Sequence, residues 1–270
     1  MQLQNKVIVV TGAGSGIGRA LVLRLVNAGA RVAAADINEN GLKETRGLAG
    51  QHADKVSMHI VNVANRETVN ALPGKVIEAH GAVDGIINNA GIIQPFVRVK
   101  DLEMEAIERV LNINLYGQIY MVKAFLPHLL KRPEAHIVNI SSMGGFFPVP
   151  GQTLYGASKA AVKLLTEGLY AEFIGTNLHV TVVFPGAIAT NIAQNSGVAI
   201  KGLGSDEQAH GFSMVTPDIA AQTILNGMVR NKFQVFIGKD ARMMDLLYRI
   251  NPHWATQFMF KQMKSLLPEQ

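Results

Sequence analysis

Short apolar runs alternate with longer amphipathic stretches along most of the chain. The apolar runs end at glycine-rich or polar turns, which is typical of buried strands. The predicted strands lie at 6–10, 31–35, 56–61, 83–87, 136–140, 179–184 and 233–237. The spacing of apolar residues between them predicts helices at 17–28, 39–49, 65–80, 103–131, 153–174 and 217–230.

This alternation predicts a parallel sheet, because parallel strands need crossover helices that cover both faces of the sheet. Right-handed crossovers then give a doubly wound α/β fold. We therefore expect a single Rossmann domain over residues 1–239, with a parallel seven-stranded sheet and helices on both faces.

Two segments depart from the alternation. Residues 187–215 are polar and have no clear period, which predicts a functional loop or lid. Residues 240–270 combine methionines and aromatic residues with interspersed Lys and Arg, which predicts a C-terminal helical tail. We expect the tail to pack over a neighbouring subunit or the substrate entrance; the alternative is an amphipathic element on a membrane surface.

Composition narrows the chemistry. The 270 residues include no cysteine, which excludes disulfides, thiolate metal sites and cysteine nucleophiles. The eight histidines are spread singly, so no metal site is expected. The net charge of +5 is scattered without a run of five basic residues, so a nucleic-acid partner is not expected either. With no apolar stretch of about 18 residues and no signal-like start, we expect a cytoplasmic protein.

A glycine-rich turn follows the first predicted strand. Residues 11–18 read Thr-Gly-Ala-Gly-Ser-Gly-Ile-Gly, with a G-x-x-x-G-x-G spacing. Such a turn lets the backbone approach a pyrophosphate, and the helix behind it offers free N–H groups. There is no P-loop Lys-Ser/Thr, which argues against phosphoryl transfer. The predicted dinucleotide contacts here are Gly12, Ser15, Gly16, Ile17 and Gly18.

Asp36 ends the second predicted strand. A carboxylate at this place can bond the hydroxyls of an adenosine ribose, and its charge repels a 2′-phosphate. No arginine follows directly, since residue 37 is Ile. Asp36 therefore favours NAD over NADP; the alternative is an ordinary turn residue.

Tyr155 and Lys159 are four residues apart on a predicted helix and share one face. An ammonium near a phenol stabilises the tyrosinate and lowers the pKa, which makes Tyr155 a candidate general acid/base. Ser142 closes the preceding strand and can bond a substrate oxygen. A Tyr-Lys pair at this spacing is very common, and taken alone it indicates a solvated helix face.

Six motifs occur in a fixed order: TGAGSGIG (11–18), NNAG (88–91), NINLYG (112–117), IVNISS (137–142), YGASK (155–159) and FPGAIAT (184–190). With these motifs the chain resembles the short-chain dehydrogenases/reductases over about residues 4–238. The resemblance implies an oxidoreductase acting on CH–OH groups with a tetrad of Asn114, Ser142, Tyr155 and Lys159. Tyr155 would pass the proton, Ser142 would orient the substrate oxygen, Lys159 would hold the nicotinamide ribose, and Asn114 would hold a relay water.

The resemblance also implies further cofactor contacts and an assembly. Asn89, Ala90 and Gly91 would lie near the adenosine side, and Pro185, Gly186, Ile188 and Thr190 near the nicotinamide. The family's Asp-Val at the adenine is Asn62-Val63 here, and we expect the contact to survive. Members of this family usually form homodimers or homotetramers through the helices predicted at 103–131 and 153–174.

The substrate is the open question. Ser142, Met143, Phe147 and Tyr155 are the predicted substrate contacts, although Phe146 and Phe147 can equally be core residues. The leading hypothesis is hydride transfer between NAD(H) and a small apolar or acyl-type alcohol or ketone. The alternatives are an NADPH-dependent 3-oxoacyl-thioester reductase and a non-catalytic NAD(H)-binding sensor.

Overall fold

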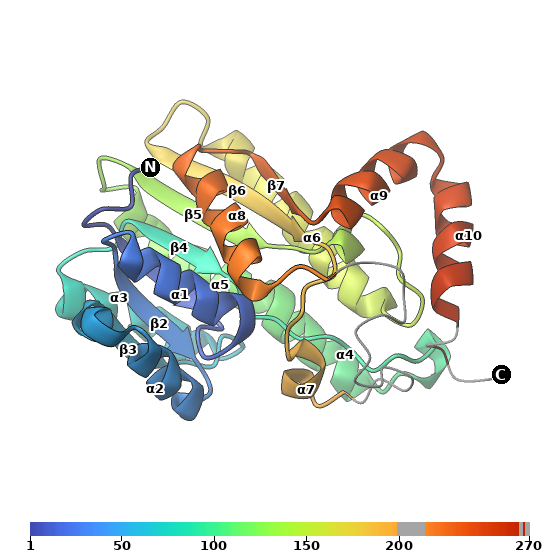
Figure 1. The fold of residues 1–270 in the computed structure, drawn as a ribbon, viewed down its shortest axis with the longest axis horizontal. Coiled ribbons are helices and arrows are strands. Elements are labelled where there is room, and N and C mark those ends of the chain that lie inside the picture. Colours follow the sequence, from blue (N-terminus) through green and yellow to red (C-terminus); the bar gives the residue numbers. More distant parts are fainter. Residues whose placement is uncertain (199–213, 265–266, 268–270) are drawn as a thin grey trace.

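The computed structural model describes residues 1–198, 214–264 and 267. At its centre is one parallel seven-stranded sheet in the order β3-β2-β1-β4-β5-β6-β7 (Figure 1). This order confirms the predicted doubly wound α/β fold. The strands are β1 (Val7–Thr11), β2 (Arg31–Asp36), β3 (Val56–Ile60), β4 (Gly85–Asn88), β5 (Ala135–Ile140), β6 (Leu178–Pro185) and β7 (Gln234–Ile237).

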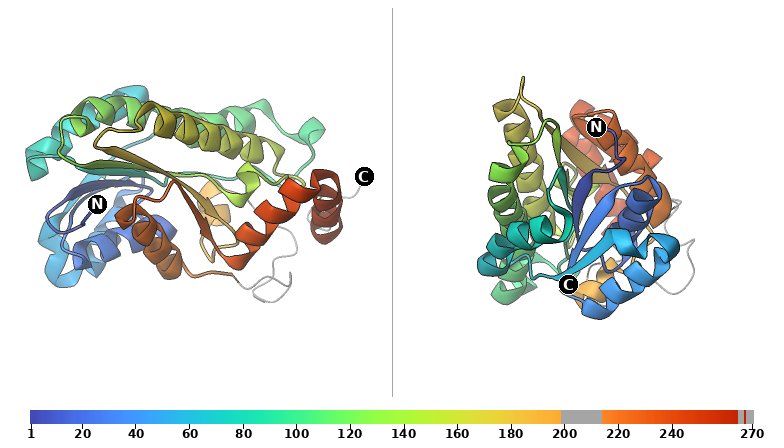
Figure 2. Two further views of the ribbon diagram at one scale, coloured as in Figure 1. Left: turned by 90° about the horizontal axis from the view of Figure 1, so that it is seen from above. Right: turned by 90° about the vertical axis from the view of Figure 1, so that its left-hand side faces the viewer.

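Helices cover both faces of the sheet (Figure 2). Successive side chains of a strand point to opposite faces, so Ile8 and Val10 belong to one apolar cluster while Val7 and Val9 belong to the other. The first cluster is covered by α1 (Gly16–Asn27), α2 (Glu39–Leu48) and α8 (Pro217–Val229). The second is covered by α3 (Arg66–His80), α5 (Gly117–Leu129) and α6 (Thr153–Glu172).

The prediction of one continuous helix over 103–131 is wrong. The structure divides it into α4 (Met104–Leu111), a π-helical turn η3 (Asn112–Tyr116) and α5. A π-turn adds one residue to a helical turn and is common at functional sites. The apolar period continues across it, which is why the pattern predicts one helix.

The predicted loop at 187–215 contains a short helix, α7 (Ile192–Ser196). Five residues are too few for a helical period to be recognised. Ile188 and Val215 form a parallel bridge that brings the ends of the segment together. The part of the predicted lid at 199–213 lies outside the described residues.

The predicted C-terminal helical tail consists of α9 (Lys239–Ile250) and α10 (Pro252–Met263) in the described part of the chain. Their inner sides pack on the residues after β5, in an apolar cluster of Phe147, Met244, Ala255 and Met259. Short 3₁₀ turns complete the described elements: η1 (Gly50–Lys55), η2 (Val99–Asp101) and η4 (Met143–Gly145). Among the helices that the structure describes, none is both long enough and apolar enough to cross a membrane.

Candidate active site

The glycine turn connects β1 to α1 at the carboxyl edge of the sheet. Gly12 and Gly16 have left-handed backbones, with φ of 67° and 50°. A Cβ on Gly18 would lie 1.9 Å from the Gly12 carbonyl oxygen, so only glycine fits there. Ser15 caps α1 without a side-chain hydrogen bond to the helix. The first N–H groups of α1 are therefore free of a side-chain cap, which suits a pyrophosphate.

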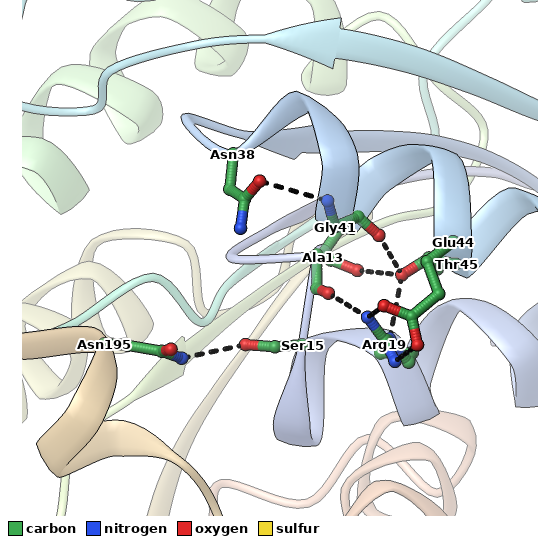
Figure 3. A network of polar contacts seen from close by, with 9 residues as sticks. Ala13, Ser15, Arg19, Asn38, Gly41, Glu44, Thr45 and Asn195 are labelled. Carbon is green, nitrogen blue, oxygen red and sulfur yellow. Dashed lines mark hydrogen bonds and ion pairs between the residues drawn. The ribbon is translucent and has the colours of Figure 1, made fainter.

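Asp36 is held by backbone donors on both carboxylate oxygens. Oδ2 accepts from the Gly14 N–H at 2.8 Å, and Oδ1 accepts from the Asn38 N–H at 2.9 Å. Asn38 in turn caps α2, because its Oδ1 accepts from the Gly41 N–H at 3.1 Å (Figure 3). The predicted ribose-binding carboxylate is thus fixed against the glycine turn.

Arg19 ties the glycine turn to α2 (Figure 3). Its Nη2 donates to the Gly14 carbonyl at 2.6 Å, and its Nε donates to Thr45 Oγ1 at 3.1 Å. The guanidinium also pairs with Glu44 and thereby holds the pKa of that carboxyl below its usual value. Sequence reasoning missed Arg19, although a charged residue directly after Gly18 was a visible signal.

A hollow of about 690 Å³ lies against this turn. Its lining includes many of the predicted cofactor residues: Gly12, Ser15, Gly16, Ile17, Asp36, Asn62, Val63, Asn89, Ala90, Gly91 and Thr190. Gly18, Pro185, Gly186 and Ile188 lie outside the lining formed by the described residues, as do the four predicted catalytic residues. The hollow therefore contains most of the residues predicted for the adenosine and pyrophosphate side, together with Thr190 from the predicted nicotinamide side.

Arg109 and Asn195 are among the lining residues that were not predicted. Arg109 of α4 donates from Nη1 to the Ser196 carbonyl at 3.1 Å, and Asn195 of α7 donates to Ser15 Oγ at 3.0 Å. Both contacts place α7 beside the hollow. No motif marks them, since they depend on where the segment after β6 folds.

The residues after β4 are tied to the end of β1. Thr11 Oγ1 accepts from the N–H groups of Asn89 and Ala90, both at 3.0 Å. The Asn89 side chain donates to the Thr11 carbonyl at 3.0 Å. These hydrogen bonds hold the lining residues Asn89 and Ala90 against the end of the neighbouring strand β1.

Asn114 lies on the π-helical turn and is fully buried. Its amide exchanges two hydrogen bonds with the Ile92 backbone, both of 2.9 Å, and also donates to Ser158 Oγ at 3.1 Å. A Cβ on Gly91 would lie 3.2 Å from Asn114 Oδ1 and 3.1 Å from Lys159 Nζ. Gly91 thus lines the hollow and also lies next to Asn114 and Lys159.

Lys159 is buried on α6, and its Nζ donates to the Ile140 carbonyl at 3.1 Å. Burial lowers the pKa of this ammonium to about 8, because a charged group loses hydration in the protein interior. The same Nζ lies 5.9 Å from the centre of the Tyr155 ring. The predicted Tyr-Lys pair therefore faces inward rather than toward solvent.

Tyr155 and Ser142 are joined by a side-chain hydrogen bond that lowers the pKa of the phenol. Burial raises that pKa more strongly, so the net shift is upward. The expected lowering of the pKa by Lys159 is not among the causes of the shift, which are burial of the phenol and its hydrogen bond with Ser142. Tyr155 is consequently protonated at neutral pH.

Gln94 holds the amino end of α6 from a distance, and sequence reasoning missed it. Its buried side chain accepts from the N–H groups of Leu154 and Tyr155 at 2.8 and 2.9 Å. It also donates to the Gly151 carbonyl at 2.9 Å. A glutamine three residues after the NNAG motif carries no local signal for this role.

Asp240 connects the tail to the segment after β6. Its Oδ2 accepts from the Ala187 N–H at 2.8 Å. A Cβ on Gly186 would lie 2.2 Å from the same carboxylate oxygen, so the backbone there fits closely against Asp240. The first turn of α9 therefore helps to hold the residues predicted to contact nicotinamide.

Apolar side chains surround the turn after Ser142. Phe146 packs edge-on against Phe184, with ring centres 5.4 Å apart. Phe147 is 1% exposed and lies edge-on to Tyr248 of α9, at 5.6 Å. Met143 packs against the same tail cluster. The structure thus gives Phe147 a packing role under the tail, and its predicted substrate contact stays a prediction.

Comparison with known proteins places the chain in a family. Residues 6–200 match the family model described as short chain dehydrogenase. The chain is 39% identical over 255 residues to the protein named SadH from Mycobacterium tuberculosis, covering 92% of this chain and 91% of that one. It is 38% identical over 200 residues to the 3-oxoacyl-[acyl-carrier-protein] reductase FabG of Thermotoga maritima, covering 72% of this chain and 78% of the reductase.

A solved structure supports the same family assignment. A short-chain dehydrogenase/reductase from Burkholderia phymatum in complex with NAD superposes with a TM-score of 0.78 at 27% identity, covering 87% of this chain and 90% of that chain. The chain therefore belongs to the short-chain dehydrogenase family and is an oxidoreductase with a site for a nicotinamide cofactor.

Proposed function

We propose that this protein transfers hydride between NAD(H) and the carbonyl or secondary alcohol of a small apolar or acyl-type molecule. The observation that carries the proposal is the group of Asn114, Ser142, Tyr155 and Lys159. Asn114 and Lys159 are buried and lie next to Gly91, which lines the hollow; Lys159 faces the Tyr155 ring, and Tyr155 bonds Ser142. When bound, the cofactor supplies or accepts the hydride, and the protein supplies orientation and proton transfer.

Tyr155 is the proposed proton donor to a ketone oxygen. Its raised pKa keeps it protonated at neutral pH, as a donor must be. Ser142 bonds the Tyr155 side chain and is placed to orient the same substrate oxygen. Lys159 lies buried beneath the ring, where its charge favours the tyrosinate that remains after proton donation.

The fit of the hollow to a dinucleotide rests on backbone geometry. The amino end of α1 lacks a side-chain cap, and a Cβ on Gly12 would lie 3.0 Å from the Ala90 backbone. We propose NAD as the favoured cofactor, since Asp36 presents a negative charge where NADP carries its 2′-phosphate.

An apolar substrate is supported by the surroundings of Ser142. Met143, Phe146 and the tail helices place methionine and aromatic side chains next to the catalytic serine. Methionine surfaces adapt to varied apolar shapes. We propose that the substrate's apolar part lies between this turn and the tail.

The first test mixes the protein with NAD⁺ and a series of secondary alcohols of increasing apolar length, and follows NADH absorbance. Tyr155→Phe should lower the rate by about 10²–10⁴-fold, while cofactor affinity, measured by NADH fluorescence, stays unchanged. Tyr170→Phe on the same helix is the matched control. An active Tyr155→Phe enzyme would remove Tyr155 from this role. NADH binding without turnover on any alcohol or ketone would favour a sensor.

A second candidate is a 3-oxoacyl-thioester reductase, favoured by the likeness to the Thermotoga maritima reductase. Asp36 argues against the NADPH dependence that we expect of such an enzyme. Turnover of a 3-oxoacyl thioester with NADPH that clearly exceeds turnover with NADH would select this candidate.

We also propose that the protein self-associates. Leu164 of α6 is 70% exposed, as is Ile174 just after the helix, and Tyr116 of the π-helical turn is 47% exposed. Apolar side chains this exposed on one sheet-covering layer are typical of an interface. Light scattering after size exclusion should give a dimer or tetramer, and Leu164→Glu should reduce its mass.

A further inference from the structure

A second hollow lies at the opposite edge of the sheet from the cofactor site. It has a volume of about 610 Å³ and lies where β2 and β3 begin and α3 ends. Three cations, Arg31, Arg46 and Lys55, line it, together with one acid, Asp54. The local balance of charge is therefore positive.

The cations around this hollow have no carboxylate partner among the residues that the structure describes. Arg31 donates from Nη1 to the His80 carbonyl at 3.5 Å, and Arg46 donates from Nε to the Ala53 carbonyl at 3.1 Å. Each contact uses one of a guanidinium's five N–H donors. The remaining N–H groups are free to bind a ligand, and the two anchors limit how far the side chains move.

Ser57 and His80 line the hollow, and the His59 imidazole contacts Ser57 from outside the lining. Ser57 Oγ lies 2.7 Å from His80 Nε2 and 2.7 Å from His59 Nε2. Burial lowers the pKa of both histidines, to about 4 for His59, so both rings are neutral at pH 7. When both imidazoles donate through Nε2–H, they occupy the two lone pairs of Ser57, and the Ser57 O–H is left to donate elsewhere.

From this arrangement we propose that the hollow binds a phosphate-type oxyanion, held by Arg31, Arg46 and Lys55 with Ser57 as a neutral donor. Guanidinium groups match the oxygens of phosphate in geometry and charge. Asp54 opposes the anion, but three cations outweigh one carboxylate. The site is distinct from the cofactor hollow, whose lining shares no residue with it. The inference is independent of the proposed catalytic function.

His80 provides a local readout. The positive charge of Arg31 contributes to lowering the His80 pKa, so an anion beside Arg31 should raise that pKa. The imidazole signals of His80 and His59 are followed by NMR during titration with inorganic phosphate at constant ionic strength. The titration is repeated with NADH in excess, which occupies the glycine turn.

The proposal predicts a saturable shift of the His80 signal with phosphate. The Arg31→Gln/Arg46→Gln double variant should bind phosphate more weakly and raise the dissociation constant at least about tenfold, because charged hydrogen bonds are lost. The Arg230→Gln/Lys232→Gln double variant removes the same charge at the β7 side and should leave the binding unchanged. Circular dichroism confirms that each variant is folded.

Two outcomes would overturn the site: no saturable His80 shift in the wild type, or the same shift in both double variants. A parallel titration with adenosine monophosphate separates two sources of the anion. If adenosine monophosphate binds more tightly than phosphate, and inorganic phosphate displaces it, the hollow is assigned to a phosphomonoester. Equal binding of both assigns it to free phosphate, and either result supports an oxyanion site.

Discussion

The proposed adenosine half and the proposed catalytic half of the site are held together in different ways. On the adenosine side, Asp36, Arg19 and Thr45 bond the glycine turn within one short stretch of chain, residues 11–45. On the catalytic side, Tyr155 and the segment after β6 depend on Gln94 and Asp240, which lie far away in sequence. Neighbours in the chain hold the glycine turn itself, whereas distant segments hold Tyr155 and the segment after β6.

This difference predicts that distant substitutions harm catalysis more than cofactor binding. Gln94→Ala leaves two part-buried N–H groups of α6 and the buried Gly151 carbonyl without this partner. A fully buried unsatisfied group costs about 1–3 kcal/mol, and part-buried N–H groups cost less because water can reach them, so thermal unfolding should show a loss of about 2–4 kcal/mol. The turnover rate should fall about tenfold to hundredfold because Tyr155 is displaced.

The control for Gln94 is Gln51→Ala, whose side chain is exposed. NADH affinity should stay close to that of the wild type in both variants, since the adenosine half is untouched. If Gln94→Ala loses stability but keeps its turnover rate, Gln94 supports the fold alone. If NADH affinity falls as much as turnover, the two halves are not independent.

A buried catalytic cation should cost stability, in contrast to the well-paired adenosine side. Lys159→Met removes an ammonium whose pKa burial lowers to about 8. The Ile140 carbonyl keeps a donor, Gln118 Nε2 at 3.3 Å. We expect the variant to gain about 1–3 kcal/mol in unfolding free energy at pH 7 and to lose activity.

The gain should depend on pH. From pH 8 to 10.5 the unfolded chain binds a proton at Lys159 that the folded protein has released, so wild-type stability rises with pH there. Below pH 8 the full cost of burying the charge remains. Denaturant unfolding should therefore show the largest difference at pH 7 and a smaller one at pH 10. Lys163→Met, which breaks an ion pair with Glu167, is the control and should show no gain.

Cofactor choice should respond to Asp36 alone. Asp36→Asn keeps an oxygen for the Gly14 N–H but removes the charge. We expect the KM for NADH to rise about tenfold, as loss of a charged hydrogen bond implies, and the KM for NADPH to fall. Steady-state kinetics with both cofactors measures the ratio, with Asp101→Asn as control. An unchanged ratio would show that Asp36 does not set the preference.

The two halves also differed in how far the sequence could predict them. Apolar periodicity predicted all seven strands, the end of the second strand indicated Asp36, and the motifs indicated the glycine turn and Asn114. Gln94 and Asp240 escaped prediction because a hydrogen bond between distant segments leaves no local pattern. The π-helical turn at Asn112–Tyr116 escaped because one extra residue in a turn does not interrupt the apolar period. The raised pKa of Tyr155 depends on burial, which no spacing reveals.

The smallest expected effect tests whether the tail belongs to the catalytic half. Asp240→Ala removes the acceptor of the Ala187 N–H, a loss of about 1 kcal/mol. Because that N–H belongs to the segment predicted to hold nicotinamide, kcat/KM for NADH should fall about fivefold. Asp245→Ala, which breaks the ion pair with Arg249 on the same helix, is the control and should change little. Equal effects of the two variants on kcat/KM would mean that α9 supports the sheet without acting on the site. A larger effect of Asp240→Ala would place the first turn of the tail among the parts that position the cofactor.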